Sequence, residues 1–501
     1  MPSFTPIPLG QPIPNSPHAV SCSLPTMRAV HGYEQKDPAI VAQMSSGYPR
    51  FVVHPFLQQL AAHYVGTRQW REQTLWLTSS RRIAAELQAV LGRGGHAATV
   101  HDFDGLTGVS HHDEAELNKH AKTFLQNTGG FLSSRAAEDR LVQLGLLAAP
   151  HPETYFPDHA LTEVRRHLQP LFAGTTVEDI LPATCGINAL YAAFRALAER
   201  QAARGRTVWV QVGWLYLDTI ALLKRHAQQP GDYVYFANVF DLPALELLFA
   251  RQGAQIAGLI IEAPTNPLLQ TADLAAISRL ARSYEAAVLI DPSVSSVFSV
   301  DVLPYADAIV ASLTKYTASE GDLMAGLVVV NPTIAGAHEL RRDIAARLEP
   351  VYPRDLARFA HEIGATRQIL RHIETTVPLV AAWLEAHPMV KSVTWAHSPK
   401  SRAHYDQIAR SPESVGSMIS FTVRKPLAAF YDQLRLPKGP SFGMKTTLIC
   451  PFIYLAHYEL ATTEAGRAEL NASGLDPDLL RLSIGIEPAQ DIIAALAEAL
   501  A

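Results

Sequence analysis

The sequence predicts an α/β protein: a large domain built on a mainly parallel sheet, followed by a smaller α+β domain. Between residues 208 and 330, short apolar runs alternate with helical patterns, which is typical of parallel strands connected by helices. After residue 333, long helical patterns and widely separated strands replace this alternation. The chain has 501 residues, of which 48% are hydrophobic and 18% charged, enough for a large core and two or three domains.

Composition argues against several classes of protein. The formal net charge of −5 provides no general attraction to nucleic acid or to anionic lipid. No apolar run approaches the roughly 18 residues of a membrane span, and the proline-broken N-terminus lacks the early Lys or Arg of a targeting peptide. The three cysteines are too few and too scattered for a disulfide framework or a zinc site; they are Cys22, Cys185 and Cys450. We therefore expect a cytoplasmic protein that binds neither nucleic acid nor membrane.

The N-terminal part, residues 1–70, is predicted to be an arm followed by a first helix. Residues 1–45 are rich in proline and show little periodicity, so we expect an extended arm that lies on the rest of the protein. A helical pattern follows through Leu57, Leu60 and Tyr64.

Residues 71–165 are predicted to be an inserted α/β segment. Strands at 75–78 and 98–101 with a helix at 81–91 suggest a small βαβ-like unit. We interpret His111 and His112 as part of a solvated loop, because no further Cys, His or Asp lies at ligand spacing. No metal site is predicted. A further helix is expected over 138–147.

The core of the large domain is expected over residues 166–333. Gly186 and Ile187 open an apolar helix, and the free N–H groups of such a turn can bind an anion. Strands and helices then alternate; the strands are expected at 208–212, 233–236, 258–262, 287–290, 308–310 and 328–330, and the helices at 242–249 and 273–284.

Residues 334–501 are predicted to form the smaller domain. Two long helices are expected, at 334–348 and 356–373, and strands are expected at 393–395, 416–423 and 482–484.

The strongest chemical signal is a lysine, Lys315, directly after the apolar strand at 308–310. Burial makes a lysine amine a usable nucleophile, and Ser312 and Thr314 beside it can bind an anion. Asp291 ends another strand at the carboxyl edge where open α/β sheets place ligands. An amine for the aldehyde, an acid for the ring nitrogen and donors for the phosphate are what pyridoxal phosphate (PLP) requires. By themselves, these residues favour a surface lysine at a strand end and a helix-capping aspartate.

Residues 258–332 resemble the PLP enzymes of cysteine and methionine metabolism, which include cystathionine γ-synthase, cystathionine γ-lyase and methionine γ-lyase. Several spaced pieces agree in order. They are Glu262-Ala263-Pro264-Thr265-Asn266-Pro267, Ile290-Asp291, Ala306-Asp307-Ala308, Ser312-Leu313-Thr314-Lys315-Tyr316 and Gly321-Asp322-Leu323-Met324-Ala325-Gly326. In that family the lysine and the aspartate are about 25 residues apart; here they are 24 positions apart. The resemblance implies the PLP-dependent transferase fold of type I, which is aspartate-aminotransferase-like with a seven-stranded type of sheet.

The resemblance also implies roles for individual residues. Lys315 would carry the cofactor and act as the catalytic base, and Asp291 would pair with the pyridine nitrogen. Tyr216 would stack on the ring and take part in catalysis, although Leu217 and Asp218 replace the two glycines that follow this tyrosine in the family. The remaining cofactor-binding residues would be Gly186, Ile187, Ser312, Thr314 and Asn266, and the substrate-binding residues Arg481 and Thr447.

Tyr48 and Arg50 match a Tyr-x-Arg motif that, in the family, reaches the phosphate of the neighbouring subunit. The resemblance therefore implies a homodimer with shared active sites and, by extension, a homotetramer. In this chain Arg50 and Gly186 lie 136 positions apart, far more than in the short enzymes of the family. The longer, cystathionine γ-synthase-like branch has an expanded N-terminal half of this kind.

The expected reaction is γ-replacement on an activated homoserine, such as an O-acyl- or O-phosphohomoserine, with cysteine or another thiol. The same residues also serve a γ- or β-lyase and an O-acylhomoserine sulfhydrylase. A non-catalytic PLP-fold protein is a further alternative, although every cofactor position is present. The sequence alone does not choose among these reactions.

Overall fold

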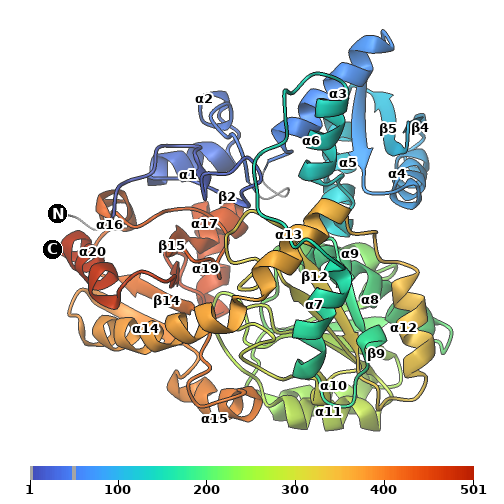
Figure 1. The fold of residues 1–501 in the computed structure, drawn as a ribbon. Helices are drawn as coiled ribbons and strands as arrows, with labels where there is room; N and C mark the ends of the chain where they lie inside the picture. The colour runs from blue at the N-terminus through green and yellow to red at the C-terminus, as the bar shows by residue number, and fades with distance from the viewer. Residues whose placement is uncertain (1–3, 48–51) are drawn as a thin grey trace.

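Seven strands form the central sheet of the large domain in a computed structural model, which describes residues 4–47 and 52–501 (Figure 1). Their order is β6 (Ile180–Ala183), β12 (Gly326–Val330), β11 (Ala308–Ser312), β10 (Ala287–Asp291), β9 (Ile256–Glu262), β7 (Val208–Val212) and β8 (Tyr233–Phe236). β12 is antiparallel to both of its neighbours, and the other pairings in this sheet are parallel. The predicted α/β fold with a mainly parallel sheet is confirmed; β6 was not predicted.

Helices cover both faces of this sheet, because alternate side chains of each strand point to opposite sides. In β9, Leu259 and Ile261 enter one core and Ile260 enters the other. The first core also receives residues from α7 (Ala160–Leu168), α10 (Leu242–Gln252) and α11 (Leu274–Ser283), and the second from α8 (Gly186–Ala202), α9 (Leu217–His226) and α12 (Ala337–Ala345). With both faces covered, the carboxyl ends of the parallel strands are left as the place for a site. Short 3-10 helices complete the connections: η1 (Gln169–Leu171), η2 (Val177–Asp179) and η3 (Leu303–Tyr305).

The smaller domain has a four-stranded antiparallel sheet. Its order is β13 (Val390–Trp395), β14 (Met418–Val423), β16 (Leu480–Ser483) and β15 (Leu448–Pro451). α14 (Thr366–Ala386) packs against β13, β14 and α20 (Ala489–Leu500). The other helices are α15 (Pro399–Ile408), α16 (Leu427–Gln433), α17 (Phe452–Ala456), α18 (Tyr458–Thr462) and α19 (Glu464–Ala472).

The single helix predicted over 356–373 is wrong. The chain forms two helices here, α13 (Pro353–Ile363) and α14, separated at Gly364, a residue of low helix propensity. The interruption lets α13 pack on α7 of the large domain while α14 packs on the small sheet.

The N-terminal segment lies along the small domain, but only part of it is extended (Figure 1). β1 (Pro12–Ile13) pairs with β2 (Ser21–Cys22), and two helices follow, α1 (Met27–Glu34) and α2 (Pro38–Val41). Leu24 connects the segment to the small domain: its N–H donates to Lys438 O (2.9 Å), and its carbonyl accepts from the Tyr431 hydroxyl (2.9 Å). The expectation of an extended arm is therefore wrong for α1, which begins at a Thr26 cap and buries one face.

The inserted segment contains a three-stranded antiparallel sheet rather than a βαβ unit. β5 (Leu106–His112) lies between β3 (Gln73–Thr78) and β4 (Ala98–Phe103). The interpretation of His111 as loop is wrong, because it lies in β5 with 1% of its surface exposed. Asp104 and Gly105, both with positive φ, form a two-residue hairpin turn whose Asp-Gly signature was available in the sequence. The helices packed around this part of the chain are α3 (Pro55–Thr67), α4 (Arg81–Arg93), α5 (Ala115–Thr128) and α6 (Ser134–Gln143).

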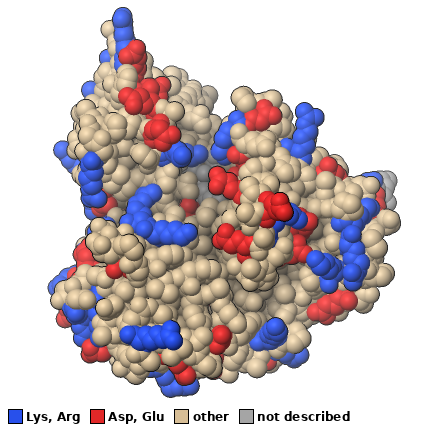
Figure 2. Space-filling view, turned by 180° about the vertical axis from the view of Figure 1, so that it is seen from behind, with Lys and Arg blue, Asp and Glu red and all other residues tan. Residues whose placement is uncertain are grey.

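Acidic and basic side chains are both spread over the face shown in Figure 2, and neither covers it alone. This distribution matches the small net charge of −5. None of the helices in residues 4–47 and 52–501 combines the length and hydropathy of a transmembrane span. The domain boundaries predicted from the sequence stay predictions.

Candidate active site

Three neighbouring parallel strands end at the wall of one cavity. The last residues of β9, β10 and β11 are Glu262, Asp291 and Ser312, and all three line the cavity. Lys315 follows β11 in the next turn and lines the same space.

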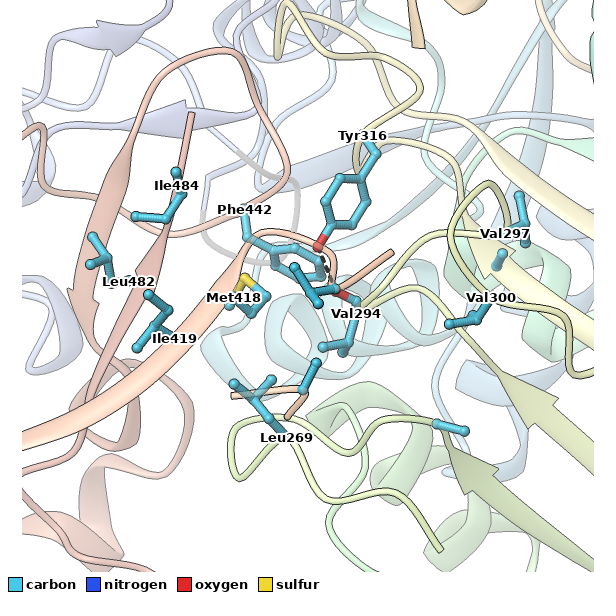
Figure 3. Packing of buried hydrophobic residues seen from close by; sticks show 14 of the residues in the cluster. Leu269, Val294, Val297, Val300, Tyr316, Met418, Ile419, Phe442, Leu482 and Ile484 are labelled. Carbon is cyan, nitrogen blue, oxygen red and sulfur yellow. Dashed lines mark hydrogen bonds between the residues drawn. The ribbon is translucent and has the colours of Figure 1, made fainter. Parts of the chain in front are cut away.

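The turn after β11 directs the Lys315 amine into the cavity. Tyr316 has a positive φ of 64° and is anchored by its hydroxyl, which donates to Val294 O (2.5 Å) and accepts from the Ser417 N–H (3.2 Å). Figure 3 shows Tyr316 packed beside Phe442 and Val294 between the two domains. Lys315 Nζ donates to Ser441 Oγ at 2.6 Å. Burial, and secondarily the charge of Arg481, lower the pKa of Lys315 to about 7.

Asp291 is held by a serine that sequence analysis missed. The backbone N–H and the hydroxyl of Ser293 donate to Asp291 Oδ1 at 2.8 and 2.5 Å. Burial raises the pKa of Asp291 to about 6, whereas the two Ser293 hydrogen bonds act in the opposite direction. Ser293 Oγ also accepts from the Ser312 N–H at 2.6 Å, which ties two strand ends together. In the sequence, the signal for this contact was a hydroxyl residue, Ser293, two positions after Asp291.

Glu262 is a second buried carboxyl group beside Asp291 that was not assigned a role. Only 4% of its surface is exposed, and it is the cross-strand partner of Asp291. Burial and the nearby Asp291 charge raise the pKa of Glu262 well above its usual range. Its Oε1 accepts a short hydrogen bond from the backbone N–H of Tyr216, and so fixes the start of α9.

The start of α8 lies against the Ser312 backbone. A Cβ added to Gly186 would approach Ser312 Cβ to 2.7 Å and Ser312 Cα to 2.9 Å, so only glycine fits. Ser312 Oγ is buried without a hydrogen-bond partner among the described residues. The N-cap residue Cys185 makes no side-chain capping bond in this 17-residue helix. The N–H groups at a helix start and an unsatisfied hydroxyl beside them can together bind a phosphate by donating hydrogen bonds to its oxygens.

Arg481 enters from β16 of the small domain and is 6% exposed. Its Nη1 donates to Asn266 Oδ1 at 3.2 Å and its Nη2 to Ser441 O at 3.0 Å. The guanidinium lies 5.1 Å from the Phe442 ring centre and 4.6 Å from that of Phe452. These contacts fix a planar cation at the cavity wall, where it can bind a carboxylate with two bonds.

The structure brings most of the predicted site residues to this cavity. Those that line it are Gly186, Ile187, Tyr216, Asn266, Asp291, Ser312, Lys315 and Arg481. Thr314 and Thr447 do not line it. The Thr314 hydroxyl donates to Ala325 O (3.3 Å) and accepts from the Ala325 N–H (3.0 Å). The Thr447 hydroxyl donates to Glu487 Oε2 at 2.6 Å.

Tyr48 and Arg50 lie outside the described residues. Ser441, which contacts the Lys315 amine, was missed as a site residue. No group of His, Cys, Asp and Glu side chains within the described residues is arranged to hold a metal ion.

The site fits PLP. The Ser312 hydroxyl and the N–H groups at the start of α8 can donate hydrogen bonds to the phosphate. The Asp291 carboxyl group lies at a strand end, where it can face the ring nitrogen. The Lys315 amine, with its lowered pKa, can reach the aldehyde. Tyr216, the N-cap of α9, lines the cavity where it can cover the ring.

Apolar side chains form most of the rest of the cavity wall, together with the hydroxyl residues Thr219, Ser293 and Ser441. The apolar residues are Leu190, Leu217, Val294, Pro440, Phe442, Cys450, Phe452, Leu455 and Ala456. Among the described lining residues, the charged ones are Glu262, Asp291, Lys315 and Arg481.

Comparison with known proteins agrees with this geometry. The profile of the Cys/Met metabolism PLP-dependent enzyme family matches residues 164–501. The chain is 35% identical to the L-2-amino-4-chloropent-4-enoate dechlorinase/desaturase of Streptantibioticus cattleyicolor, over 95% of both chains. It is 26% identical to a cystathionine γ-synthase of Neurospora crassa, over 99% of this chain and 98% of the other.

A solved structure resembles the chain as well. The cystathionine γ-synthase of Xanthomonas oryzae pv. oryzae, in complex with aminoacrylate and cysteine, superposes with a TM-score of 0.58. The two sequences are 25% identical, and the match covers 68% of this chain and 86% of that chain.

Proposed function

Because the chain belongs to the Cys/Met metabolism family of PLP-dependent enzymes, we propose that it eliminates a leaving group from the γ-carbon of a short, uncharged L-amino acid. The observation that carries this proposal is the apolar part of the cavity wall, to which Phe452 and Leu455 contribute. The proposed γ-elimination differs from the γ-replacement that we expected from the sequence.

The charged groups of the cavity are already engaged by the cofactor and the amino-acid core of a substrate. Lys315 and Asp291 face the cofactor, and Arg481 is the cation available to the substrate α-carboxylate. Among the described lining residues, no second cation remains for a further carboxylate. An acidic side chain, or a second amino acid beside the first, would bury a charge without a partner, which is costly.

One relative acts on a substrate with this chemistry. The Streptantibioticus enzyme is named for L-2-amino-4-chloropent-4-enoate, a short amino acid with chlorine on its γ-carbon, and for dechlorination and desaturation. Its side chain carries no charge and suits an apolar wall.

The chain's own residues account for binding and proton movement. Arg481, held by Asn266 and Ser441, orients the substrate through its α-carboxylate. With a pKa of about 7, the Lys315 amine is neutral in about half of the molecules at pH 7. It can therefore accept the proton from Cα. Once it has released that proton and is neutral again, it can accept the proton from Cβ, and the product regains a proton in place of the one lost from Cα. PLP, when bound, withdraws electrons from Cα and makes that proton acidic.

The elimination is balanced without a further reactant. One proton leaves Cβ and the leaving group departs from Cγ with the bonding electrons. The new π bond between these carbons keeps the electron pair of the broken C–H bond. The apolar wall excludes water and thiols from Cγ, so that loss of the leaving group is not followed by addition.

A substrate panel tests the proposal. The PLP-loaded enzyme is incubated with L-2-amino-4-chloropent-4-enoate and with O-acetyl-, O-succinyl- and O-phosphohomoserine, each with and without cysteine. We expect chloride release and a product lighter by HCl, at a rate independent of cysteine, and poor turnover of the two anionic homoserine esters. Turnover only when a thiol is present, with a thioether product, would refute elimination.

A wall variant tests the apolar contact itself. Leu455 is 4% exposed and lines the cavity, so Leu455→Asn should raise KM for the chloro substrate about tenfold, which corresponds to one buried apolar contact. The cofactor absorbance should not change. Leu379→Asn is the matched control, because Leu379 is 58% exposed on α14. Equal effects of the two substitutions would contradict the assigned wall.

γ-Replacement of the cystathionine γ-synthase type is the second candidate. It is supported by the 26% identity to the Neurospora enzyme and by the likeness to a synthase structure with bound cysteine. The cysteine arm of the substrate panel decides between the two candidates.

A further inference from the structure

The last turn of α5, in the inserted segment, lies against the beginnings of both α8 and α9 (Figure 1). These two helix starts carry cavity-lining residues, Gly186 and Ile187 in α8 and Leu217 and Thr219 in α9. α5 itself contributes no residue to the cavity wall. Three contacts connect α5 to the two helix starts.

The first contact holds α8. Asn188, the third residue of this helix, is fully buried. Its Nδ2 donates to the carbonyl of Thr128, the last residue of α5, at 3.0 Å. Its Oδ1 accepts from the Glu349 N–H at 3.0 Å. The first turn of α8 is therefore tied on one side to the inserted segment.

The second contact holds α9. Gln126 Nε2 donates to Asp218 Oδ1 at 2.6 Å, and Asn127 Nδ2 reaches Asp218 O at 3.5 Å. Asp218 is 2% exposed and lies between Leu217 and Thr219. Asp218 therefore connects the first turn of α9 to the end of α5.

The third contact is a close approach. Gly129 caps α5 in the left-handed conformation, with φ of 65°. A Cβ at this position would lie 2.6 Å from Cys185 Sγ and 3.0 Å from Asn188 N. The end of α5 thus touches the residue that precedes Gly186.

We infer that α5 of the inserted segment positions the cofactor site, with Gln126–Asp218 setting the start of α9 and Thr128–Asn188 setting the start of α8. The two turns that flank the cavity would then be fixed relative to one another before the cofactor binds, which lowers the ordering cost of binding. Gln126 and Asp218 are positioning residues, since neither touches the bound group. This inference depends on PLP as cofactor and not on which reaction follows.

Exchanging the hydrogen-bond donor and acceptor of the Gln126–Asp218 pair tests this inference in the full-length enzyme. Gln126→Glu places two carboxylates together, so the Kd for PLP should rise about tenfold or more, the effect of losing one buried hydrogen bond. Asp218→Asn keeps an acceptor for Gln126, so its Kd should stay within about threefold of wild type. The double variant Gln126→Glu/Asp218→Asn reverses the donor and the acceptor and should return the Kd to within about threefold of wild type.

The readouts separate positioning from general stability. PLP affinity is measured by titrating the apoenzyme and following absorbance, and the circular dichroism of the bound cofactor reports its orientation. Melting of the apoenzyme reports stability. Gln368→Glu, the same substitution at an exposed position of α14, is the matched control and should change neither Kd nor dichroism.

The expected pattern is a weakened Kd and altered dichroism in Gln126→Glu, both restored in the double variant. The inference is overturned if Gln126→Glu binds PLP within about twofold of wild type, a change too small for a buried bond. It is also overturned if the double variant recovers its melting temperature but not its Kd. If Gln126→Glu does not fold, Gln126→Ala takes its place, and unchanged PLP affinity in that variant overturns the inference in the same way.

Discussion

Replacing the cofactor-site lysine should stabilise the apoenzyme at neutral pH. In the folded chain, burial and the Arg481 charge lower the pKa of Lys315 from 10.5 to about 7. An amine whose pKa is lower in the folded state binds fewer protons there than in the unfolded chain. The lysine therefore destabilises the folded state. This destabilisation is complete below about pH 7 and decreases as the pH rises to 10.5. Lys315→Met removes this contribution.

The size of the effect follows from the shift. The fall from 10.5 to about 7 corresponds to roughly 4 kcal/mol of stability at pH 7 and roughly 2 kcal/mol at pH 9. Methionine also leaves Ser441 without the 2.6 Å bond from the amine, at a pH-independent cost of about 1 kcal/mol. The stability difference between variant and wild type should therefore shrink by about 2 kcal/mol between pH 7 and pH 9.

Urea unfolding of both apoenzymes at pH 7, 8 and 9 measures this difference. Lys438→Met provides a graded comparison, because burial lowers the pKa of Lys438 only to about 8. The difference in unfolding free energy between Lys438→Met and wild type should shrink by about 1 kcal/mol between pH 7 and pH 9. A Lys315→Met difference that stays constant from pH 7 to pH 9 would refute the assigned burial of the amine.

Three further predictions concern function. Asp291→Asn should still bind PLP but lose most turnover, because a neutral amide cannot stabilise a protonated ring nitrogen; unchanged kcat would make this aspartate purely structural. Arg481→Lys should raise KM about tenfold or more through loss of two-bond carboxylate binding, and an unchanged KM in steady-state assays would remove Arg481 from the substrate site. Mixing inactive Arg50→Ala chains with inactive Lys315→Ala chains should restore activity after subunit exchange, if each site is completed by a neighbouring chain. Demonstrated exchange without activity would contradict the shared site. An active monomer at assay concentration would contradict both the shared site and the expected dimer or tetramer.

Much of the site was predictable because its chemistry lies at the ends of elements with strong local patterns. β10 and β11 are apolar runs, and the residues that end or follow them, Asp291 and Lys315, are conspicuous there. Gly186 at a helix start and Arg481 in an apolar strand were assigned through the resemblance to the family. Hydrophobic periodicity likewise predicted the parallel sheet, since both of its faces are buried.

Other parts depended on contacts between distant segments. Lys315 and Ser441 are 126 residues apart, and no local pattern indicates that their side chains meet. Thr314 resembles a phosphate ligand in sequence, but its hydroxyl is used by the Ala325 backbone. Thr447 is similarly taken by Glu487.

The sequence by itself thus determined most strands of the large sheet from residue type and local spacing, and it indicated the cofactor and the family through the order and spacing of several matching motifs. Only the tertiary structure decided which hydroxyl contacts the amine, which side chains form the apolar wall and how α5 meets two helix starts. Those outcomes depend on how the domains and the inserted segment pack. A buried polar group binds whichever partner the fold brings within about 3 Å, since an unmade hydrogen bond there is costly.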